Sequence, residues 1–152
     1  MLNSHQFITP SADLSTADID YSDDFGNAIA ITDVDGDDIN DLVVGAYLYH
    51  NIYIIFLAND TTSVSFQRIS MDSNFGSSIA ALGDLDGDTV NDIVVGAYID
   101  DDGGVNVGAV YILFLNQAGT YNSYQKISND YGDLEFWLFE NGHSWNCFSS
   151  LR

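Results

Sequence analysis

Two short aspartate-rich segments contain the residues of this sequence that could do the most distinctive chemistry. Their sequences are DVDGDDIND at residues 33–41 and DLDGDTVND at residues 84–92. Each segment places carboxylates at relative positions 1, 3, 5 and 9, within a stretch that a single loop can hold. A cation of the size of calcium takes six to eight oxygen ligands, which alternate acidic side chains in a tight loop can supply. The pattern therefore predicts two Ca²⁺ sites.

The predicted ligands of each site are four carboxylates and one main-chain carbonyl. Position 7 is apolar in both segments, which suits a residue that contributes only its carbonyl oxygen. Without an ion, carboxylates this close repel one another, so some of their pKa values should be raised. Magnesium fits less well, because it demands a strict octahedron and tends to keep its waters. The ligand sets are Asp33, Asp35, Asp37, Ile39 and Asp41 in the first segment, and Asp84, Asp86, Asp88, Val90 and Asp92 in the second.

Three other interpretations of the aspartates are weaker. An EF-hand needs a Glu at position 12, where this sequence has Val44 and Val95, and it needs flanking helices. A glycosidase needs carboxylates on opposite faces of a sugar ring, not at alternate positions of one loop. Aspartate turns that meet only water are the remaining alternative. Metal loops are favoured because the pattern occurs twice, each time followed by VVGAY.

The two segments belong to a tandem repeat. Residues 23–47 match residues 73–98, NIYIIFL matches VYILFL, and QRIS matches QKIS further along the chain. The offset between the copies grows from 50 to 58 residues, through one extra residue before the second aspartate segment and an insertion after Tyr98. Both insertions are expected in loops. The sequence thus predicts a repeat of about 50–58 residues.

Each repeat contains about four strand-like runs and no helix-period segment. The Val-rich runs after the aspartate segments are typical of strands buried on both faces, and the last run of each repeat alternates like a half-exposed outer strand. Four-stranded units at this period are typical of β-propeller blades, whereas the repeats of a solenoid β-helix are much shorter. The predicted strands are residues 28–31, 42–47, 52–57, 63–70, 79–82, 93–98, 110–115 and 121–128.

The predicted fold is all-β, an incomplete β-propeller of two complete blades with partial flanking blades. Residues 23–72 and 73–130 are the expected blades. Residues 1–22 are expected to be an N-terminal segment or partial blade, and residues 131–152 a divergent tail or the start of a further blade. Propellers close with four to eight blades, so further blades are expected from a longer parent chain or from self-association.

At these residues the sequence resembles the FG-GAP repeat family, which forms the blades of integrin α-subunit propellers and related extracellular proteins. The matching elements are Phe25-Gly26 with Gly45-Ala46, and Phe75-Gly76 with Gly96-Ala97, with an aspartate segment between each pair. The resemblance covers about residues 23–128. It implies that calcium binds in the loop between the first two strands of each blade, through side chains at positions 1, 3, 5 and 9 and the carbonyl at position 7.

Two departures from the family pattern concern single positions. Position 6 is usually Gly, and here it is Asp38 or Thr89, which bears on calcium affinity because Gly eases the turn. The family motif usually ends in Gly-Ala-Pro, and here Tyr47 and Tyr98 replace the Pro. The second difference is expected to matter little.

The charge balance excludes several classes of partner. Three Lys and Arg against 23 Asp and Glu give a formal net charge of −20, and 21 of the 23 acids are Asp. Such a polyanion repels nucleic acid and anionic membrane surfaces. No apolar run approaches 18 residues, so no direct membrane insertion is expected. The sequence is 46% apolar, which excludes an acidic disordered tail.

The remaining residues suggest no catalytic site. The tyrosines of the predicted strands are expected in core and edge packing, and a single Cys forms no intrachain disulfide. The N-terminus shows no signal peptide, so an extracellular or cell-surface location implies a fragment of a longer protein. Weak candidates are a nucleophile pair or zinc pair near the C-terminus and a glycosylation sequon: Ser144, Ser149 and Ser150 with His143, His143 with Cys147, and Asn59.

The predicted function is therefore non-catalytic. A calcium-binding propeller segment would act in adhesion or recognition, with a protein or glycan as its ligand. The alternatives are a lectin-like propeller that binds carbohydrate in pockets between blades, and an accessory domain of a secreted hydrolase whose catalytic residues lie outside this chain.

Overall fold

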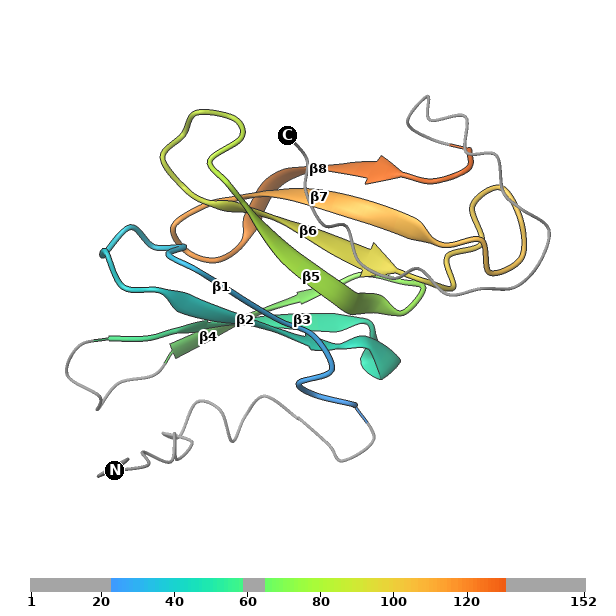
Figure 1. Cartoon of the computed structure of the whole chain (residues 1–152), viewed down its shortest axis with the longest axis horizontal. Helices are drawn as coiled ribbons and strands as arrows, with labels where there is room; N and C mark the ends of the chain where they lie inside the picture. The colour runs from blue at the N-terminus through green and yellow to red at the C-terminus, as the bar shows by residue number, and fades with distance from the viewer. Residues whose placement is uncertain (1–22, 59–64, 131–152) are drawn as a thin grey trace.

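The computed structural model describes residues 23–58 and 65–130, which form two four-stranded antiparallel sheets (Figure 1). Strands consecutive in sequence are neighbours in both sheets, so each sheet is a simple meander. The first sheet consists of β1 (Ile29–Thr32), β2 (Asp41–Ala46), β3 (Asn51–Phe56) and β4 (Ser65–Ser70). The second consists of β5 (Phe75–Gly83), β6 (Asp92–Ala97), β7 (Ala109–Leu115) and β8 (Tyr121–Ile127).

The all-β prediction and the four-stranded units are confirmed. The described residues contain no α-helix, only a 3₁₀ turn at Tyr47–Tyr49, and no helix among them could span a membrane. Several predictions fall outside the described residues: the flanking segments 1–22 and 131–152, the sequon at Asn59, and the candidates His143 and Cys147.

The extra residue before the second aspartate segment lies in a strand, not in a loop as expected. In the first sheet, β1 pairs with β2 without interruption from Ile29 to Thr32. In the second, the register between β5 and β6 shifts between Ala81 and Gly83. The additional residue, Leu82, is therefore accommodated as a β-bulge, which absorbs one residue while the ladder continues on both sides.

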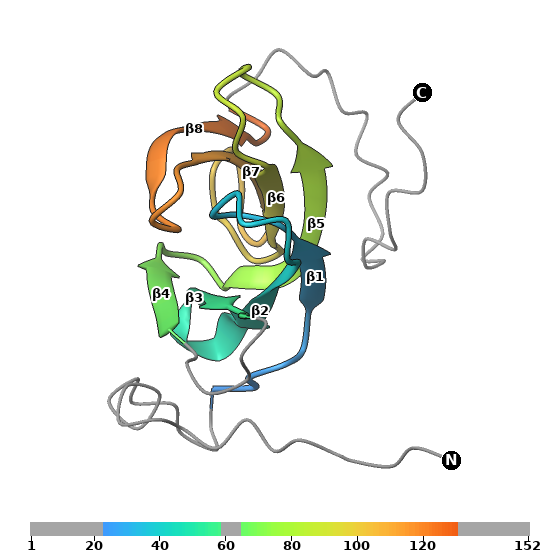
Figure 2. The same ribbon diagram turned by 90° about the vertical axis from the view of Figure 1, so that its left-hand side faces the viewer.

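The two sheets pack against each other through one apolar core. Their first strands, β1 and β5, lie side by side (Figure 2). The central strands β2 and β6 are mostly buried, as their Val-rich sequences predict, while the outer strand β8 is largely exposed. The core includes Ala30, Val34, Val43, Ile52, Ile54 and Ile69 from the first repeat, and Phe75, Val90, Ile93, Val95, Ala97, Tyr111, Leu113 and Leu115 from the second.

The opposite face of the first sheet carries a second, smaller apolar cluster of Val44, Ala46, Tyr53 and Ile55. In the repeat alignment these four positions correspond to core residues of the second sheet, Val95, Ala97, Tyr111 and Leu113. The two sheets therefore pack with unlike faces together. The face that the second sheet turns toward the first corresponds, in the first sheet, to the face that points away from the second sheet.

Glycines of the two repeats lie where the two sheets come close together. A Cβ atom on Gly76 would lie 2.5 Å from the main-chain oxygen of Asn51, and one on Gly45 would collide with the main-chain oxygen of Gly76. The Asn27 side chain also donates to the Ser77 carbonyl across the junction, at 3.1 Å. The Gly of one Phe-Gly pair thus lies against the Gly-Ala of the preceding repeat.

The tyrosines that replace Pro in the motif have a structural role that the sequence did not suggest. The rings of Tyr47 and Tyr98 pack edge to face, with centroids 5.8 Å apart. Because one ring follows β2 and the other follows β6, this contact joins the two sheets at the ends of their second strands. The substitution is therefore part of the interface between the repeats.

Candidate metal centres

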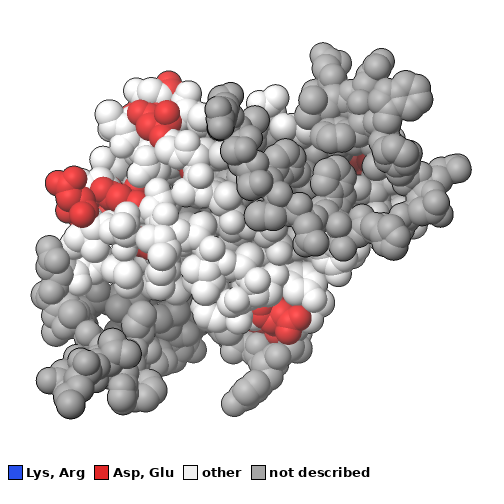
Figure 3. Space-filling view, in the orientation of Figure 1, with Lys and Arg blue, Asp and Glu red and all other residues white. Residues whose placement is uncertain are grey.

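The two aspartate segments form the β1–β2 and β5–β6 loops, at equivalent positions in the two sheets. Acidic atoms gather over both loops at the same end of the molecule (Figure 3), with no Lys or Arg atom visible among the described residues on that face. This is the position that the family resemblance implied. The loops and not the strand faces therefore present the densest negative charge on this face.

The first loop is folded around the carboxylate of its first residue. One oxygen of Asp33 accepts the N–H of Gly36 at 2.8 Å, and the other accepts the N–H of Asp38 at 3.0 Å. Asp37 in turn accepts the N–H of Ile39 at 2.8 Å. These bonds turn the chain so that Asp33, Asp35 and Asp37 each place a carboxylate oxygen within 4.8 Å of the others.

The second loop repeats this geometry. The carboxylate of Asp84 accepts the N–H groups of Gly87 at 2.7 Å and Thr89 at 3.0 Å, and Asp88 accepts that of Val90 at 2.9 Å. The carboxylates of Asp84, Asp86 and Asp88 are gathered within the same 4.8 Å. Two stretches of different sequence thus adopt one loop fold, because the residues they share are those that make its hydrogen bonds.

The position 9 aspartates, Asp41 and Asp92, are fully buried below their loops. Asp41 accepts the N–H of Val34 at 2.9 Å and that of Leu57 at 3.0 Å, one on each oxygen. Asp92 accepts the equivalent N–H groups of its own repeat at 2.9 and 3.0 Å. Each carboxylate therefore ties the loop to the chain at the end of the third strand of its sheet, a role that the sequence did not reveal.

The donor set fits a calcium ion in its chemistry. All candidate groups are oxygens, and each carboxylate keeps at least one lone pair beside the N–H bonds it accepts. The gathered triads contain positions 1, 3 and 5 of both loops and leave out Asp41 and Asp92. The roles of those two residues and of the Ile39 and Val90 carbonyls as ligands stay predictions.

Three of these carboxyl groups have a raised pKa in the folded chain without calcium. Burial is the largest cause for Asp35, Asp41 and Asp86, and repulsion from the neighbouring aspartates adds to it. The expected direction is confirmed, but desolvation contributes more than the repulsion on which the expectation rested.

These shifts predict opposite pH dependence with and without calcium. In calcium-free buffer the raised folded-state pKa values destabilise the fold at neutral pH, and this loss disappears as pH falls through them toward 3.8. The melting temperature should therefore rise as pH falls from neutral through the raised pKa values toward 3.8. With calcium it should fall, because protons compete with the ion for the carboxylates. Thermal unfolding across this range checks the sign, and parallel slopes in the two buffers would contradict it.

Position 6 of each loop has a left-handed backbone although neither residue is glycine. Its φ is 67° at Asp38 and 76° at Thr89. Aspartate tolerates this region, whereas a β-branched residue is strained there. The family preference for Gly at this position therefore has a direct conformational cause.

Thr89→Gly is expected to raise the free energy of unfolding by about 1 kcal/mol, since a left-handed L-residue costs about 1–2 kcal/mol and Gly loses some of this gain to chain entropy. The hydrogen bond to Asp84 is kept, because its donor is the main-chain N–H of residue 89. Urea unfolding in calcium-free buffer measures the change. Asp38→Gly is the matched control and should gain less, so a larger gain at residue 38 would argue against the explanation.

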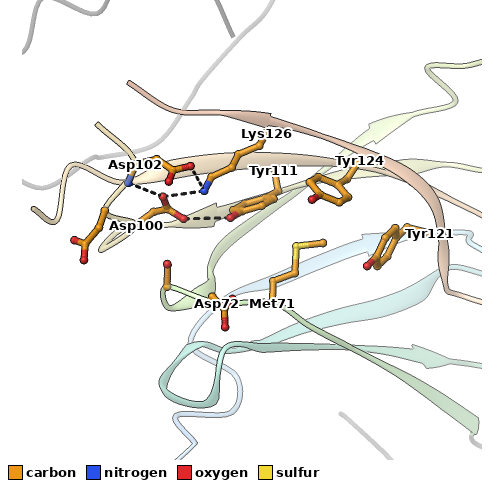
Figure 4. Close-up of a pocket in the computed structure, with 10 residues that line it drawn as sticks. Met71, Asp72, Asp100, Asp102, Tyr111, Tyr121, Tyr124 and Lys126 are labelled. Atoms are coloured by element: carbon orange, nitrogen blue, oxygen red, sulfur yellow. Dashed lines mark hydrogen bonds and ion pairs between the residues drawn. The ribbon is translucent and has the colours of Figure 1, made fainter. Parts of the chain in front are cut away.

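A pocket that the sequence did not predict lies at the outer margin between the two repeats (Figure 4). Its volume is about 370 Å³, and Tyr111, Tyr121 and Tyr124 contribute rings to its lining. Tyr111 is buried as expected, but Tyr121 and Tyr124 are 37% and 52% exposed and are not core residues. The available signal was the insertion after Tyr98, which supplies three of the four acidic residues of the pocket, Asp100 to Asp102.

The polar side of this pocket is a closed network around Asp100, which is 2% exposed. Lys126 lies 3.0 Å from Asp100 and also pairs with Asp102, while the Tyr111 hydroxyl donates to Asp100 at 3.1 Å. Burial alone raises the pKa of Asp100, but Lys126, the Asp102 N–H and Tyr111 together outweigh it and hold that pKa below its ordinary value. The network therefore fixes the insertion against β7 and β8.

Comparisons with known proteins agree with the repeat. Residues 25–64 and 75–113, together more than half of the chain, match the FG-GAP repeat. Human integrin alpha-11 is 39% identical over 104 residues, or 58% of this chain and 8% of that protein. Mouse integrin alpha-2 is 32% identical over 142 residues, or 84% of this chain and 12% of that protein. The chain thus spans only 8–12% of the length of these curated relatives.

Proposed function

Because the chain belongs to the FG-GAP repeat family, we propose that residues 23–72 and 73–130 are two calcium-binding propeller blades that act in adhesion or recognition without catalysis. The observation that carries the proposal is the presence of two loops with the same carboxylate geometry at the same end of the molecule. The similarity to integrin alpha chains supports a cell-surface or extracellular location and a protein ligand.

The chain's own residues prepare each loop for the ion. Bound calcium supplies a positive centre that neutralises the gathered carboxylates. The N–H bonds to Asp33 and Asp84 fix the turn in which the carboxylates converge, and Asp41 and Asp92 anchor the loop to its sheet. Because the triads form only in the folded chain, calcium binding adds to the free energy of folding. The proposed role of the loops is to hold the ends of the blades rigid.

Calcium is expected to raise the melting temperature of the purified chain. At a calcium concentration a hundredfold above its Kd, each site adds about 2.7 kcal/mol to the free energy of unfolding. Differential scanning calorimetry of metal-free protein, with and without CaCl₂, measures the effect. MgCl₂ at the same concentration is the control and should act less, since magnesium keeps its waters. An unchanged melting temperature in calcium would remove the basis of the proposal.

The pocket between the blades favours glycan recognition as a second candidate function. Tyr121 and Tyr124 pack edge to face, with centroids 5.9 Å apart, and their exposed rings can stack on sugar faces. Asp72 and Asp101, on the rim, can accept hydrogen bonds from hydroxyl groups. Binding of the purified chain to immobilised oligosaccharides tests this. Tyr124→Ala should abolish binding, and Tyr49→Ala, at an exposed tyrosine outside the pocket, should preserve it; equal binding by both variants would exclude the pocket.

A further inference from the structure

One hydrogen bond connects the two aspartate loops directly. The side-chain amide of Asn91 donates to the main-chain carbonyl of Asp33 at 2.8 Å, over a sequence separation of 58 residues. Asn91 is position 8 of the second loop, and Asp33 is position 1 of the first. The donor and the acceptor therefore both belong to candidate metal loops, one in each blade.

Both residues that make this bond lie in segments whose backbone metal ligation would fix. Asn91 stands between Val90 and Asp92, the predicted ligands at positions 7 and 9. On the other side, the carboxylate of Asp33 is the one around which the first loop folds. Val90 and Val34, next to the donor and the acceptor, are both buried in the core that the two blades share. The backbone on both sides of the bond is therefore held in place, so the donor and the acceptor keep their relative positions.

We propose that Asn91 couples the two loops, so that calcium bound in one raises the affinity of the other. The inference rests on the proposed function, since it requires both loops to bind the ion. Filling the second loop holds the backbone on both sides of Asn91, which places its amide to keep the Asp33 carbonyl in position. Coupling between sites is reciprocal, so the first loop acts on the second by the same factor. One hydrogen bond corresponds to a factor of about two to ten in affinity.

The repeat supplies a matched control for this residue. Position 8 of the first loop is also an asparagine, Asn40. As in the second loop, it follows an apolar residue at position 7 and precedes an aspartate at position 9. Asn40 is exposed, and within the described residues no hydrogen bond of its side chain crosses to the second blade. Replacing Asn40 therefore perturbs one metal loop at the same position without touching the link.

The experiment measures the calcium affinity of the first loop by isothermal titration calorimetry, with the second loop intact or disabled by Asp86→Asn with Asp88→Asn. In the wild-type chain, disabling the second loop should weaken the first by about two- to tenfold. Asn40→Ala should preserve this ratio, although the affinity itself can change. Asn91→Ala should bring the ratio close to one. Asn91→Leu, which keeps the side-chain shape and lacks a donor, should do the same if the alanine variant folds poorly.

Each outcome decides a separate point. A ratio of one in the wild-type chain, or an unchanged ratio in both Asn91 variants, would overturn the coupling while leaving two working calcium sites. Loss of the ratio in Asn40→Ala as well would assign the effect to loop structure and would also overturn it. An absence of calcium binding in the wild-type chain would overturn the proposed function itself, and the coupling with it. Calcium-free melting curves of all variants establish that they are folded.

Discussion

Gly76→Ala is expected to destabilise the chain by about 2–5 kcal/mol and to loosen the packing of the two blades. Two costs add at this residue. Its φ is 95°, where an L-residue costs about 1–2 kcal/mol. The new Cβ would also lie 2.5 Å from the Asn51 carbonyl oxygen, and an overpacked interface of this kind costs about 1–3 kcal/mol. Main-chain atoms form the obstacle, so the clash is relieved only if the blades move apart.

Gly26 separates these two costs, because it is the same position in the first repeat. Its φ of 94° is almost identical, yet a Cβ there meets nothing within 4 Å in the described part of the chain. Gly26→Ala should therefore cost only the backbone term, about 1–2 kcal/mol. Gly45→Ala tests the contact from the other side, since it collides with Gly76 without a left-handed backbone. Urea unfolding of the three variants measures the differences.

Equal destabilisation by Gly76→Ala and Gly26→Ala would mean that the backbone conformation alone explains the glycines. The interface between the blades would then have no part in the requirement. A smaller m-value or two separate transitions in Gly76→Ala would instead indicate that the blades have become independent units.

Asp92→Ala should destabilise the chain by about 2–6 kcal/mol even in the complete absence of calcium. The side chain is fully buried and accepts the N–H groups of Leu85 and Leu115 at 2.9 and 3.0 Å. Without it, each N–H loses its acceptor, at about 1–3 kcal/mol per buried donor. Metal ligation alone predicts no such loss in calcium-free buffer, so the measurement separates the structural role of this aspartate from its predicted role as a ligand.

Asp86→Ala is the matched variant within the same loop. Asp86 is exposed and accepts one N–H from Asp88 at 3.2 Å. Its pKa is raised by partial desolvation and by repulsion from its acidic neighbours. In calcium-free buffer its removal should change the free energy of unfolding by no more than about 0.5 kcal/mol. In calcium both variants should lose the stabilisation of the second site. Similar calcium-free losses in the two variants would contradict the division of roles.

The sequence predicted the strands well because each copy of the repeat confirms the other. Val-rich runs after each aspartate segment indicated β2 and β6, and the structure moves their ends by one residue. The loops could be predicted for the same reason, since their hydrogen bonds are local and made by the residues that recur. The bulge at Leu82 could not be predicted, because the sequence does not show whether one extra residue enters a strand as a bulge or lengthens the loop beside it.

Contacts between the repeats were not predictable from residue types. The edge-to-face pair of Tyr47 and Tyr98 and the bond from Asn91 to Asp33 join residues more than 50 positions apart. Nothing in their local sequence distinguishes them from exposed residues. The second role of Asp92 was hidden in the same way, since its partner Leu115 lies on the third strand of its sheet.

The stacking of the blades joins unlike faces and is therefore heterologous. The core between the blades contains Val95 and Tyr111 of the second blade and Val43 and Ile54 of the first. The first-blade equivalents of Val95 and Tyr111 are Val44 and Tyr53, which lie on the outer face of the first sheet. The second-blade equivalents of Val43 and Ile54 are Val94 and Ile112, on the outer face of the second sheet. The outer face of the first blade thus resembles the face that the second blade buries, and the outer face of the second blade resembles the face that the first blade buries. Such a contact propagates in one direction without consuming its own binding surfaces, and only closure into a ring terminates it.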